Sequence, residues 1–245
     1  MKWPKLKRTE QPAAVEAANT RDRVIYQAAA WCLSYPDEEL RSRAPMIRAA
    51  LAEQSNGTSG KGAAAGTASG TSNQDPGEAF EPVLQDLENA ELADIQASYV
   101  QEFDLSRRHA LHLSYWTDGD TRNRGEVLAE FKQVYRQYDV LVDTHGELPD
   151  YLPMVLEFAA TVNLEAGREL LLKFRPSVEL LRLALADAKL SHTGVVQAIC
   201  NTLPGPSPTD RNAVMEMART GPPVESVGLD PYDPRLLPLS TSKGP

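Results

Sequence analysis

Residues 125–142 read GEVLAEFKQVYRQYDVLV, and the apolar side chains in this stretch recur every three or four positions. That spacing places them on one face of an α-helix, where they can pack against a core. The apolar positions are Val127, Leu128, Phe131, Val134, Tyr135, Tyr138, Leu141 and Val142. The stretch therefore predicts a long amphipathic helix.

The same helical spacing recurs along most of the chain, and no stretch shows the period of two that is typical of a half-buried strand. Pro36 ends the first predicted helix, because the residue before a proline is kept out of the α region. Asp37 and Asp150 are each predicted to cap the helix that follows them. The other predicted helices cover residues 20–35, 37–53, 83–87, 92–103, 150–163, 165–174, 177–190, 193–203 and 208–219. Together they predict an all-α fold, a single helical domain of about 8–10 helices.

Three segments depart from this pattern. Residues 55–75 are mainly glycine, serine, threonine and alanine, with no apolar side chain larger than alanine. We expect a disordered low-complexity insertion in a loop, since the two helices before it could not bury a core alone and long loops close at little cost. Residues 1–18 and the proline-rich residues 221–245 are predicted to be flexible tails. The helical domain then spans residues 19–220.

The chain carries 25 Lys and Arg residues against 34 Asp and Glu residues, a formal net charge of -9. Such a charge repels nucleic acid and anionic membranes, and it favours a basic segment of a partner protein. The basic N-terminus is not followed by the apolar stretch of a signal peptide. No apolar run approaches the roughly 20 residues that cross a bilayer. We expect a cytoplasmic protein that binds no nucleic acid and does not insert into a membrane.

Motifs for catalysis are missing from the sequence. It contains no glycine-rich phosphate loop, no Gly-x-Ser-x-Gly elbow and no His-Glu-x-x-His. Cys32 and Cys200 both sit among apolar residues, which predicts buried thiols. His109 and His112 have the spacing of a metal-binding pair, but two arginines beside them repel a cation and no acid or cysteine adjoins. No metal site is predicted.

The segment 99–104 ends a predicted helix with two acids. Tyr99 and Phe103 fall on its core-facing stripe, whereas Glu102 and Asp104 lie at its carboxyl end. Acids there oppose the helix dipole unless a base pairs with them. Either the two acids pair inside the fold with an arginine of residues 119–125, or they belong to a functional site that binds a partner.

Residues 119–125 read GDTRNRG, two glycines that bracket Asp120, Arg122 and Arg124. Arginine forks can hold carboxylates or phosphates at two points. The alternative is a tight turn between helices whose charges pair internally. The sequence leaves both possibilities open.

Residues 147–153 read ELPDYLP and predict the start of a helix. Pro149 sets the entry into the helix, and a proline in the first turn loses no hydrogen bond. Glu147 and Asp150 also extend the negative charge on that side of the molecule.

Three segments together resemble a known family. They are YVxxFD at 99–104, YWTDGDTRxRG at 115–125 and ELPDYLPxVLEF at 147–158, in this order. This pattern resembles the nitrate reductase delta-subunit chaperones, which belong to the wider TorD-like group of redox-enzyme maturation proteins. The resemblance covers roughly residues 24–205 and implies a TorD-like helical fold.

The resemblance implies a chaperone rather than an enzyme. Such proteins bind the N-terminal segment of the apo catalytic α subunit of respiratory nitrate reductase. They keep that subunit competent for insertion of molybdenum cofactor and an iron–sulfur cluster before it docks at the membrane. They hold no cofactor permanently, and proteins of molybdenum cofactor biosynthesis are further expected partners. The partner-binding residues that the resemblance implies are Tyr99, Glu102, Phe103, Asp104, Asp120, Arg122, Arg124, Glu147, Asp150 and Tyr151.

Two alternatives are compatible with the sequence. The client of the chaperone could be a different molybdoenzyme, an N-oxide or sulfoxide reductase, although the ELPDYLP segment favours the nitrate branch. A second, different class is a small-molecule enzyme that uses Asp120/Arg122 and Glu147/Asp150 as acid–base groups. Its only nearby histidine in sequence is His145.

Overall fold

The computed structural model describes residues 13–56, 75–118, 123–140 and 146–220. In this part of the chain every regular element is helical, and the only β-type pairing is an isolated bridge between His112 and Tyr151. The elements are α1 (Ala13–Cys32), α2 (Glu38–Asn56), α3 (Pro76–Asn89), α4 (Leu92–Tyr99), a π-helical turn (Val100–Asp104), a 3-10 turn (Arg107–His109), α5 (Leu113–Asp118), α6 (Asn123–Gln137), α7 (Leu152–Thr161), α8 (Leu164–Lys173), α9 (Arg175–Ala188), α10 (Thr193–Asn201) and α11 (Arg211–Thr220). The predicted all-α class is confirmed.

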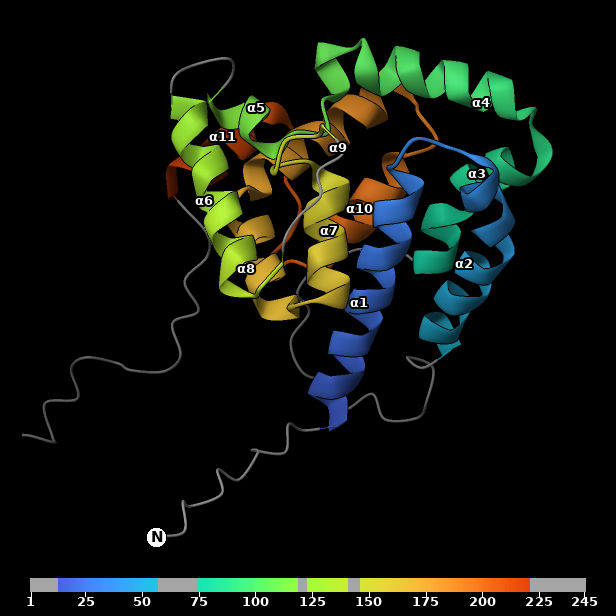
Figure 1. Cartoon of the computed structure of the whole chain (residues 1–245), viewed down its shortest axis with the longest axis horizontal. Coiled ribbons are helices and arrows are strands. Elements are labelled where there is room, and N and C mark those ends of the chain that lie inside the picture. The colour runs from blue at the N-terminus through green and yellow to red at the C-terminus, as the bar shows by residue number, and fades with distance from the viewer. Residues whose placement is uncertain (1–12, 57–74, 119–122, 141–145, 221–245) are drawn as a thin grey trace, which may run out of the picture.

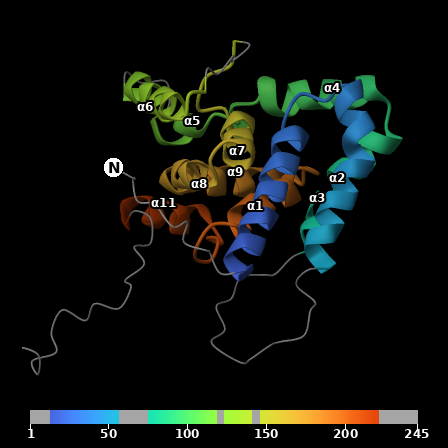
Figure 2. The ribbon, with the colours of Figure 1, turned by 60° about the horizontal axis from the view of Figure 1, so that its bottom comes forward.

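Helix α1 runs through the middle of the molecule and packs most extensively against α7 (Figure 1). The α2–α3 hairpin lies on one side of α1, and α10 connects that hairpin to α9. On the other side α7 packs on α8, and α5 packs on α6 and α9. In Figure 1 and in the rotated view of Figure 2, α4 crosses the end of the molecule at which α1 finishes.

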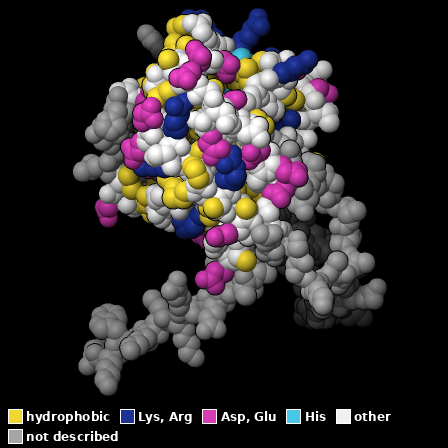
Figure 3. Space-filling model, turned by 90° about the vertical axis from the view of Figure 1, so that its right-hand side faces the viewer, with side chains coloured by type: hydrophobic (Ala, Val, Ile, Leu, Met, Phe, Trp, Pro, Cys, Tyr) yellow, Lys and Arg dark blue, Asp and Glu magenta, His cyan; other side chains and the backbone are white. Residues whose placement is uncertain are grey.

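The core is a continuous set of buried apolar side chains from nearly all of these helices. Tyr26 of α1 is fully buried, and its hydroxyl lies 2.6 Å from the Thr202 hydroxyl beyond α10. Cys32 and Cys200 are buried free thiols, which confirms the prediction. Figure 3 shows that on the face of the α2–α3 side, apolar side chains gather only in small groups between charged ones.

Several predicted boundaries shift in the structure. Helix α1 begins at Ala13, so residues 13–18 are helical where a flexible tail is predicted. Helix α2 continues to Asn56, and the Asp75 carboxylate accepts a hydrogen bond from Gly77 N at 2.8 Å at the start of α3. The predicted 55–75 insertion therefore begins inside α2 and ends at the residue that caps α3. Residues 57–74 and 221–245 lie outside the described residues.

The long amphipathic helix exists but is shorter than predicted. Helix α6 ends at Gln137, and Asp139 adopts a left-handed conformation with φ of 55°. Leu141 and Val142, the last positions of the apolar stripe, lie outside the described residues. Asp37 caps α2 as predicted, since its carboxylate accepts from Leu40 N at 2.7 Å. Within the described residues, none of the helices combines the length and hydrophobicity that crossing a membrane requires.

Helices α7 and α8 approach so closely that glycine is required between them. A Cβ added to Gly167 of α8 would lie 2.2 Å from the Ala159 Cβ of α7 and 2.5 Å from its Cα. Both residues are buried, so neither helix can move aside without disturbing the core.

We therefore expect Gly167→Ala to lower the free energy of unfolding by about 1–3 kcal/mol through overpacking. Gly125→Ala is the matched control, because Gly125 is also helical but an added Cβ there meets nothing within 4 Å. That control should gain up to about 1 kcal/mol from helix propensity. Urea unfolding followed by circular dichroism measures both, and an unchanged Gly167→Ala midpoint would contradict the close approach.

Candidate functional site

Two loops far apart in sequence pair at the end of the molecule where α1 finishes. Leu152 N donates to Leu111 O at 2.8 Å, and Leu113 N donates to Asp150 O at 3.0 Å. This short antiparallel pairing brings the ELPDYLP segment beside the residues that follow the π-helical turn. The predicted segments 99–104 and 147–153 therefore meet in space.

The first part of the site is a set of hydrogen-bonded tyrosines. The Tyr99 hydroxyl donates to Leu33 O at 2.9 Å and lies 3.1 Å from the Tyr151 hydroxyl. The Tyr35 ring meets Tyr99 edge-on at 5.6 Å, and Phe103 packs on Tyr99 at 4.9 Å. Burial raises the pKa of Tyr151 to about 12 and raises that of Tyr99 further. Both hydroxyls therefore stay neutral at physiological pH, and their hydrogen bonds hold the two rings in place.

The aromatic wall, formed by Tyr35, Tyr99, Phe103 and Tyr151, includes an irregular helix end. After α4 the chain continues as a π-helical turn in which Leu105 N donates to Val100 O at 2.9 Å. π-Helical turns are rare, and those that do occur are often found at functional sites. Tyr99 directly precedes the turn and Phe103 lies within it, and both side chains are buried.

These residues enclose a surface pocket of about 480 Å³, which we call the aromatic pocket. Its walls are mainly aromatic, and two acids and two basic side chains lie among them. The lining residues are Tyr35, Tyr99, Phe103, Asp104, Ser106, Arg107, Ala110, Leu111, His112, Tyr115, Glu147 and Tyr151. The aromatic pocket thus combines aromatic rings with several polar and charged side chains in one concave site.

Asp150 does not have its predicted role as the cap of α7. Helix α7 begins at Leu152, and the fully buried Asp150 carboxylate points instead to the start of α5. There it accepts from Ser114 N at 3.0 Å and from the Ser114 hydroxyl at 2.5 Å. Arg124 Nη2 lies 3.8 Å from the same carboxylate, and Arg124 Nε donates to the Ser114 hydroxyl at 3.2 Å. Asp150 thus caps α5 across the fold.

His112 connects this buried carboxylate to the surface. Its Nδ1 lies 3.4 Å from Asp150 Oδ1, and its Nε2 lies 3.7 Å from the half-exposed Glu147 carboxylate. Burial raises the pKa of Asp150, but the neighbouring His112 and the hydrogen bonds from Ser114 outweigh it, so that the pKa lies below the ordinary value. Asp150 is therefore an anion at neutral pH behind the pocket wall.

The predicted site residues lie in several different places in the structure. Tyr99, Phe103, Asp104, Glu147 and Tyr151 line the aromatic pocket. Asp150 and Arg124 lie behind its wall. Glu102 and Tyr99 line a second pocket on the other side of Tyr99, whereas Asp120 and Arg122 lie outside the described residues. Whether any of them binds a partner stays a prediction.

The two acids at the end of the 99–104 segment have no ion-pair partner among the described residues. Arg124, one of their proposed partners, contacts Asp150 and Ser114 and lies over the Tyr115 ring at 5.9 Å. His109 contacts the carbonyl oxygen of Glu102 at 3.0 Å through its Nδ1. Among the residues that the structure describes, no group of three His, Cys, Asp or Glu side chains could hold a metal ion.

Sequence reasoning missed part of the aromatic pocket. Tyr35, His112 and Tyr115 line it, but none is among the predicted site residues. Tyr115 lies inside the family-like 115–125 segment, so a motif signal for it existed. His112 has no such signal, because its role depends on pairing with Tyr151, 39 positions away.

Comparison with known proteins gives one family. A family model described as "Nitrate reductase delta subunit" matches residues 71–193. The chain is 34% identical over 164 residues to a Bacillus subtilis (strain 168) protein named probable nitrate reductase molybdenum cofactor assembly chaperone NarJ, which covers 65% of this chain and 78% of that protein. It is also 33% identical over 98 residues to NarJ of Escherichia coli (strain K12), covering 40% of this chain and 41% of that one.

A third relative is longer. The nitrate reductase-like protein NarX of Mycobacterium tuberculosis (strain H37Rv) is 47% identical over 119 residues, which are 49% of this chain and 18% of NarX. The matched part thus spans less than a fifth of NarX. A crystal structure from Archaeoglobus fulgidus, described as a proposed redox enzyme maturation protein, gives a TM-score of 0.49 at 16% identity over 80% of this chain and 97% of that one.

We expect Asp150→Asn to lower the free energy of unfolding by about 1–3 kcal/mol at pH 7, because the buried donors lose a charged acceptor. The pKa of Asp150 is depressed below 3.8 in the folded protein, so its contribution is present above about pH 4 and is lost as the pH falls through the folded value. The gap between wild type and variant should therefore close at low pH. Urea unfolding between pH 7 and pH 2.5 measures it, with the exposed Asp187→Asn as control. A constant gap would contradict the ionised state.

Proposed function

Because the chain belongs to the nitrate reductase delta subunit family, we propose that it is an assembly chaperone for a respiratory nitrate reductase. In this proposal it binds the N-terminal segment of the apo catalytic α subunit in the cytoplasm. It keeps that subunit competent for insertion of molybdenum cofactor and an iron–sulfur cluster until the subunit docks at the membrane. The cofactor belongs to the client, and the chaperone holds none permanently.

Family membership confirms the resemblance that the three segments indicate, since the matched residues 71–193 contain all of them. The expectation of a non-catalytic protein agrees with it. The geometry of Asp150 also argues against the acid–base alternative: this carboxylate is fully buried and hydrogen-bonded to Ser114. A group in that state cannot reach a substrate.

The family match carries the proposal, and exposed large side chains in or next in sequence to the lining of the aromatic pocket support it. Tyr35 lines the pocket and is 48% exposed, and Leu105, 67% exposed, lies between two pocket residues. Leu148 follows the pocket residue Glu147 and is 37% exposed. Exposed large apolar side chains near a concave site are typical of a surface that a binding partner covers.

A client helix suits this site. An amphipathic helix can lay its apolar face into such a groove, with positions one turn apart filling successive hollows. The aromatic walls offer large contact areas, and their hydrogen bonds fix them before binding, which lowers the entropy cost of association. Asp104 and Glu147 at the pocket favour basic residues beside the apolar face, in line with the net charge of -9.

The alternative client is another molybdoenzyme, an N-oxide or sulfoxide reductase. The relatives from Bacillus subtilis and Escherichia coli both carry names of nitrate reductase chaperones, which supports the nitrate branch. A competition experiment decides between them. The α-subunit peptide should displace a labelled copy of itself at much lower concentration than peptides from the other reductases.

We expect the double variant Tyr35→Ser/Leu105→Ser to bind a synthetic peptide of the α-subunit N-terminus at least about tenfold more weakly than wild type, because exposed apolar anchors are lost. The double variant Met46→Ser/Met215→Ser is the matched control, since both methionines are 52% exposed and do not line the pocket. Isothermal titration calorimetry measures the affinities. Equal affinities of the two double variants would place the client elsewhere.

Deleting the gene should leave the α subunit present but without molybdenum, because the apo-subunit is no longer held open for its cofactor. Immunoblotting measures the subunit, and elemental analysis of the purified enzyme measures the metal. Re-expression of the wild-type chain should restore molybdenum, while the Tyr35→Ser/Leu105→Ser variant should restore less. A fully metallated enzyme in the deletion strain would refute the role in cofactor insertion.

A further inference from the structure

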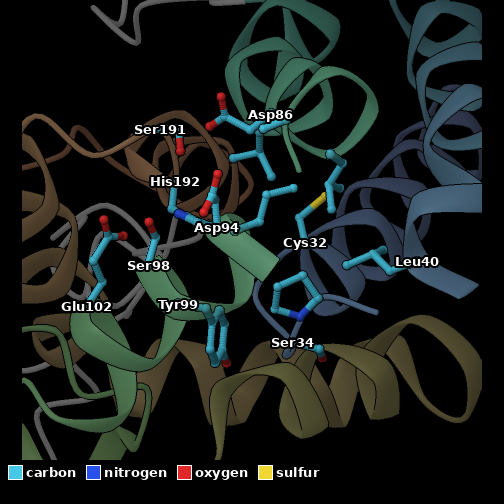
Figure 4. A pocket seen from close by; sticks show the side chains of 15 residues that line it. Cys32, Ser34, Leu40, Asp86, Asp94, Ser98, Tyr99, Glu102, Ser191 and His192 are labelled. Carbon is cyan, nitrogen blue, oxygen red and sulfur yellow. The ribbon is translucent and has the colours of Figure 1, made fainter. Parts of the chain in front are cut away.

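A second pocket lies on the opposite side of Tyr99 from the aromatic pocket, between α3 and α4, and we call it the α3–α4 pocket (Figure 4). Its volume is about 230 Å³. That is below the range of about 300–1,000 Å³ typical of small-molecule sites and is closer to the size of one large side chain. It opens beside the exposed end of α4, where Ser98 lies at its edge.

The floor of this pocket is apolar. Cys32, Leu40, Val83 and Leu87 are all buried and line it. Ile95 of α4 adds a half-buried aliphatic wall. Such a floor can receive an alkyl chain but offers nothing to a polar head group.

The rim carries three carboxylates from three different elements. Asp86 comes from α3, Asp94 from α4 and Glu102 from the π-helical turn. In Figure 4 they lie on one side of the pocket, with Cys32 and Leu40 on the other. The pKa of Glu102 is raised, first by burial and also by the charge of Asp86, while His109 lowers it in part. The charges of Asp86 and Glu102 thus act on one another across the opening.

No lysine or arginine lines the α3–α4 pocket, and within the described part of the chain none of the three carboxylates has an ion-pair partner. The nearby Arg41 donates its hydrogen bonds to the carbonyl oxygens of Leu87 and Ala90 at the end of α3. The aromatic pocket differs in this respect, since Arg107 and His112 accompany its acids. The α3–α4 pocket is therefore the more strongly anionic of the two.

An unsatisfied acceptor in the same pocket points to a ligand independently of the acids. His192 lines the pocket, and burial lowers its pKa to about 4, so the ring is neutral. Its Nδ1 is buried and has no hydrogen-bond partner among the described residues. With the ring proton on Nε2, Nδ1 accepts a hydrogen bond, and an N–H group inside the pocket would supply it.

We propose that the α3–α4 pocket binds one lysine or arginine side chain of the client segment. The aliphatic stem lies on the apolar floor, the cationic head group lies between Asp86, Asp94 and Glu102, and an N–H group reaches His192. Long basic side chains combine a stem of this kind with a charged end. The inference rests on the proposed function, and it adds the chemistry that one anchor of the client must have.

This anchor also gives the client a direction. The aromatic pocket and the α3–α4 pocket share Tyr99 as their common wall. A helix whose apolar face occupies the aromatic pocket would place a basic residue over the other pocket in one orientation only. A fixed charge contact of this type sets register and partner choice more than total affinity.

The test compares two sets of charge-neutralising variants against the synthetic α-subunit N-terminal peptide. Asp86→Asn/Asp94→Asn/Glu102→Gln removes the rim, and Glu53→Gln/Glu169→Gln/Asp187→Asn removes three exposed acids elsewhere. Each changes the net charge from -9 to -6, because three negative charges are lost. Calorimetry should show about tenfold weaker binding for the rim variant and less than about twofold for the control.

A second pair of variants keeps the test valid if the rim variant fails to fold. Ser98→Arg places a cation at the edge of the pocket, and Ala97→Arg places the same charge one residue away on exposed α4 surface that does not line it. Ser98→Arg should weaken peptide binding to the same extent as the rim variant, and Ala97→Arg should not.

Substitutions in the peptide complete a double-mutant cycle with the rim variant. Replacing each lysine and arginine of the peptide by glutamine, one at a time, should identify one position whose loss weakens binding to wild type but not to the rim variant. Equal effects of rim and control variants, or of Ser98→Arg and Ala97→Arg, on a peptide that binds wild type would overturn this inference alone. A peptide that does not bind wild type would overturn the proposed function and this inference with it.

Discussion

The structure of the binding end depends on one buried charge. The Asp150 carboxylate has no contact with solvent, and a buried anion is tolerated only where donors surround it. Ser114, His112 and Arg124 come from other parts of the chain to meet this need. In doing so they hold the 147–152 loop against the start of α5, and the aromatic pocket exists because these two loops are paired.

A second constraint joins this end to the body of the fold. The carbonyl of Leu33, at the end of α1, accepts a hydrogen bond from Tyr99, and Tyr99 in turn meets Tyr151. Because α1 packs along α7 through the core, the positions of both pockets are fixed by the rigid part of the molecule. If the protein binds a flexible client segment as proposed, a surface that is already ordered leaves the entropy cost of ordering to the client alone.

In the proposed function the two pockets divide the task of recognition. The aromatic pocket offers five aromatic rings among side chains of both charges, which suits a helix with an apolar and a polar face. The α3–α4 pocket offers a small apolar floor beneath unpaired carboxylates, which suits a single cation. Tyr99 belongs to both, so a change in this residue would disturb apolar and charged contacts together.

The sequence by itself determined the helical class, the family and the burial of Cys32, because helical periodicity and local motifs report how each segment meets the core. It also named five residues that line the aromatic pocket. Only the tertiary structure decided that Asp150 caps α5, that Glu102 faces a different pocket from Asp104, and that His112 lies between two carboxylates. These roles join residues 35 to 38 positions apart, or place two residues of one helical turn in different pockets. Such relations arise from packing between segments, which no local sequence pattern encodes.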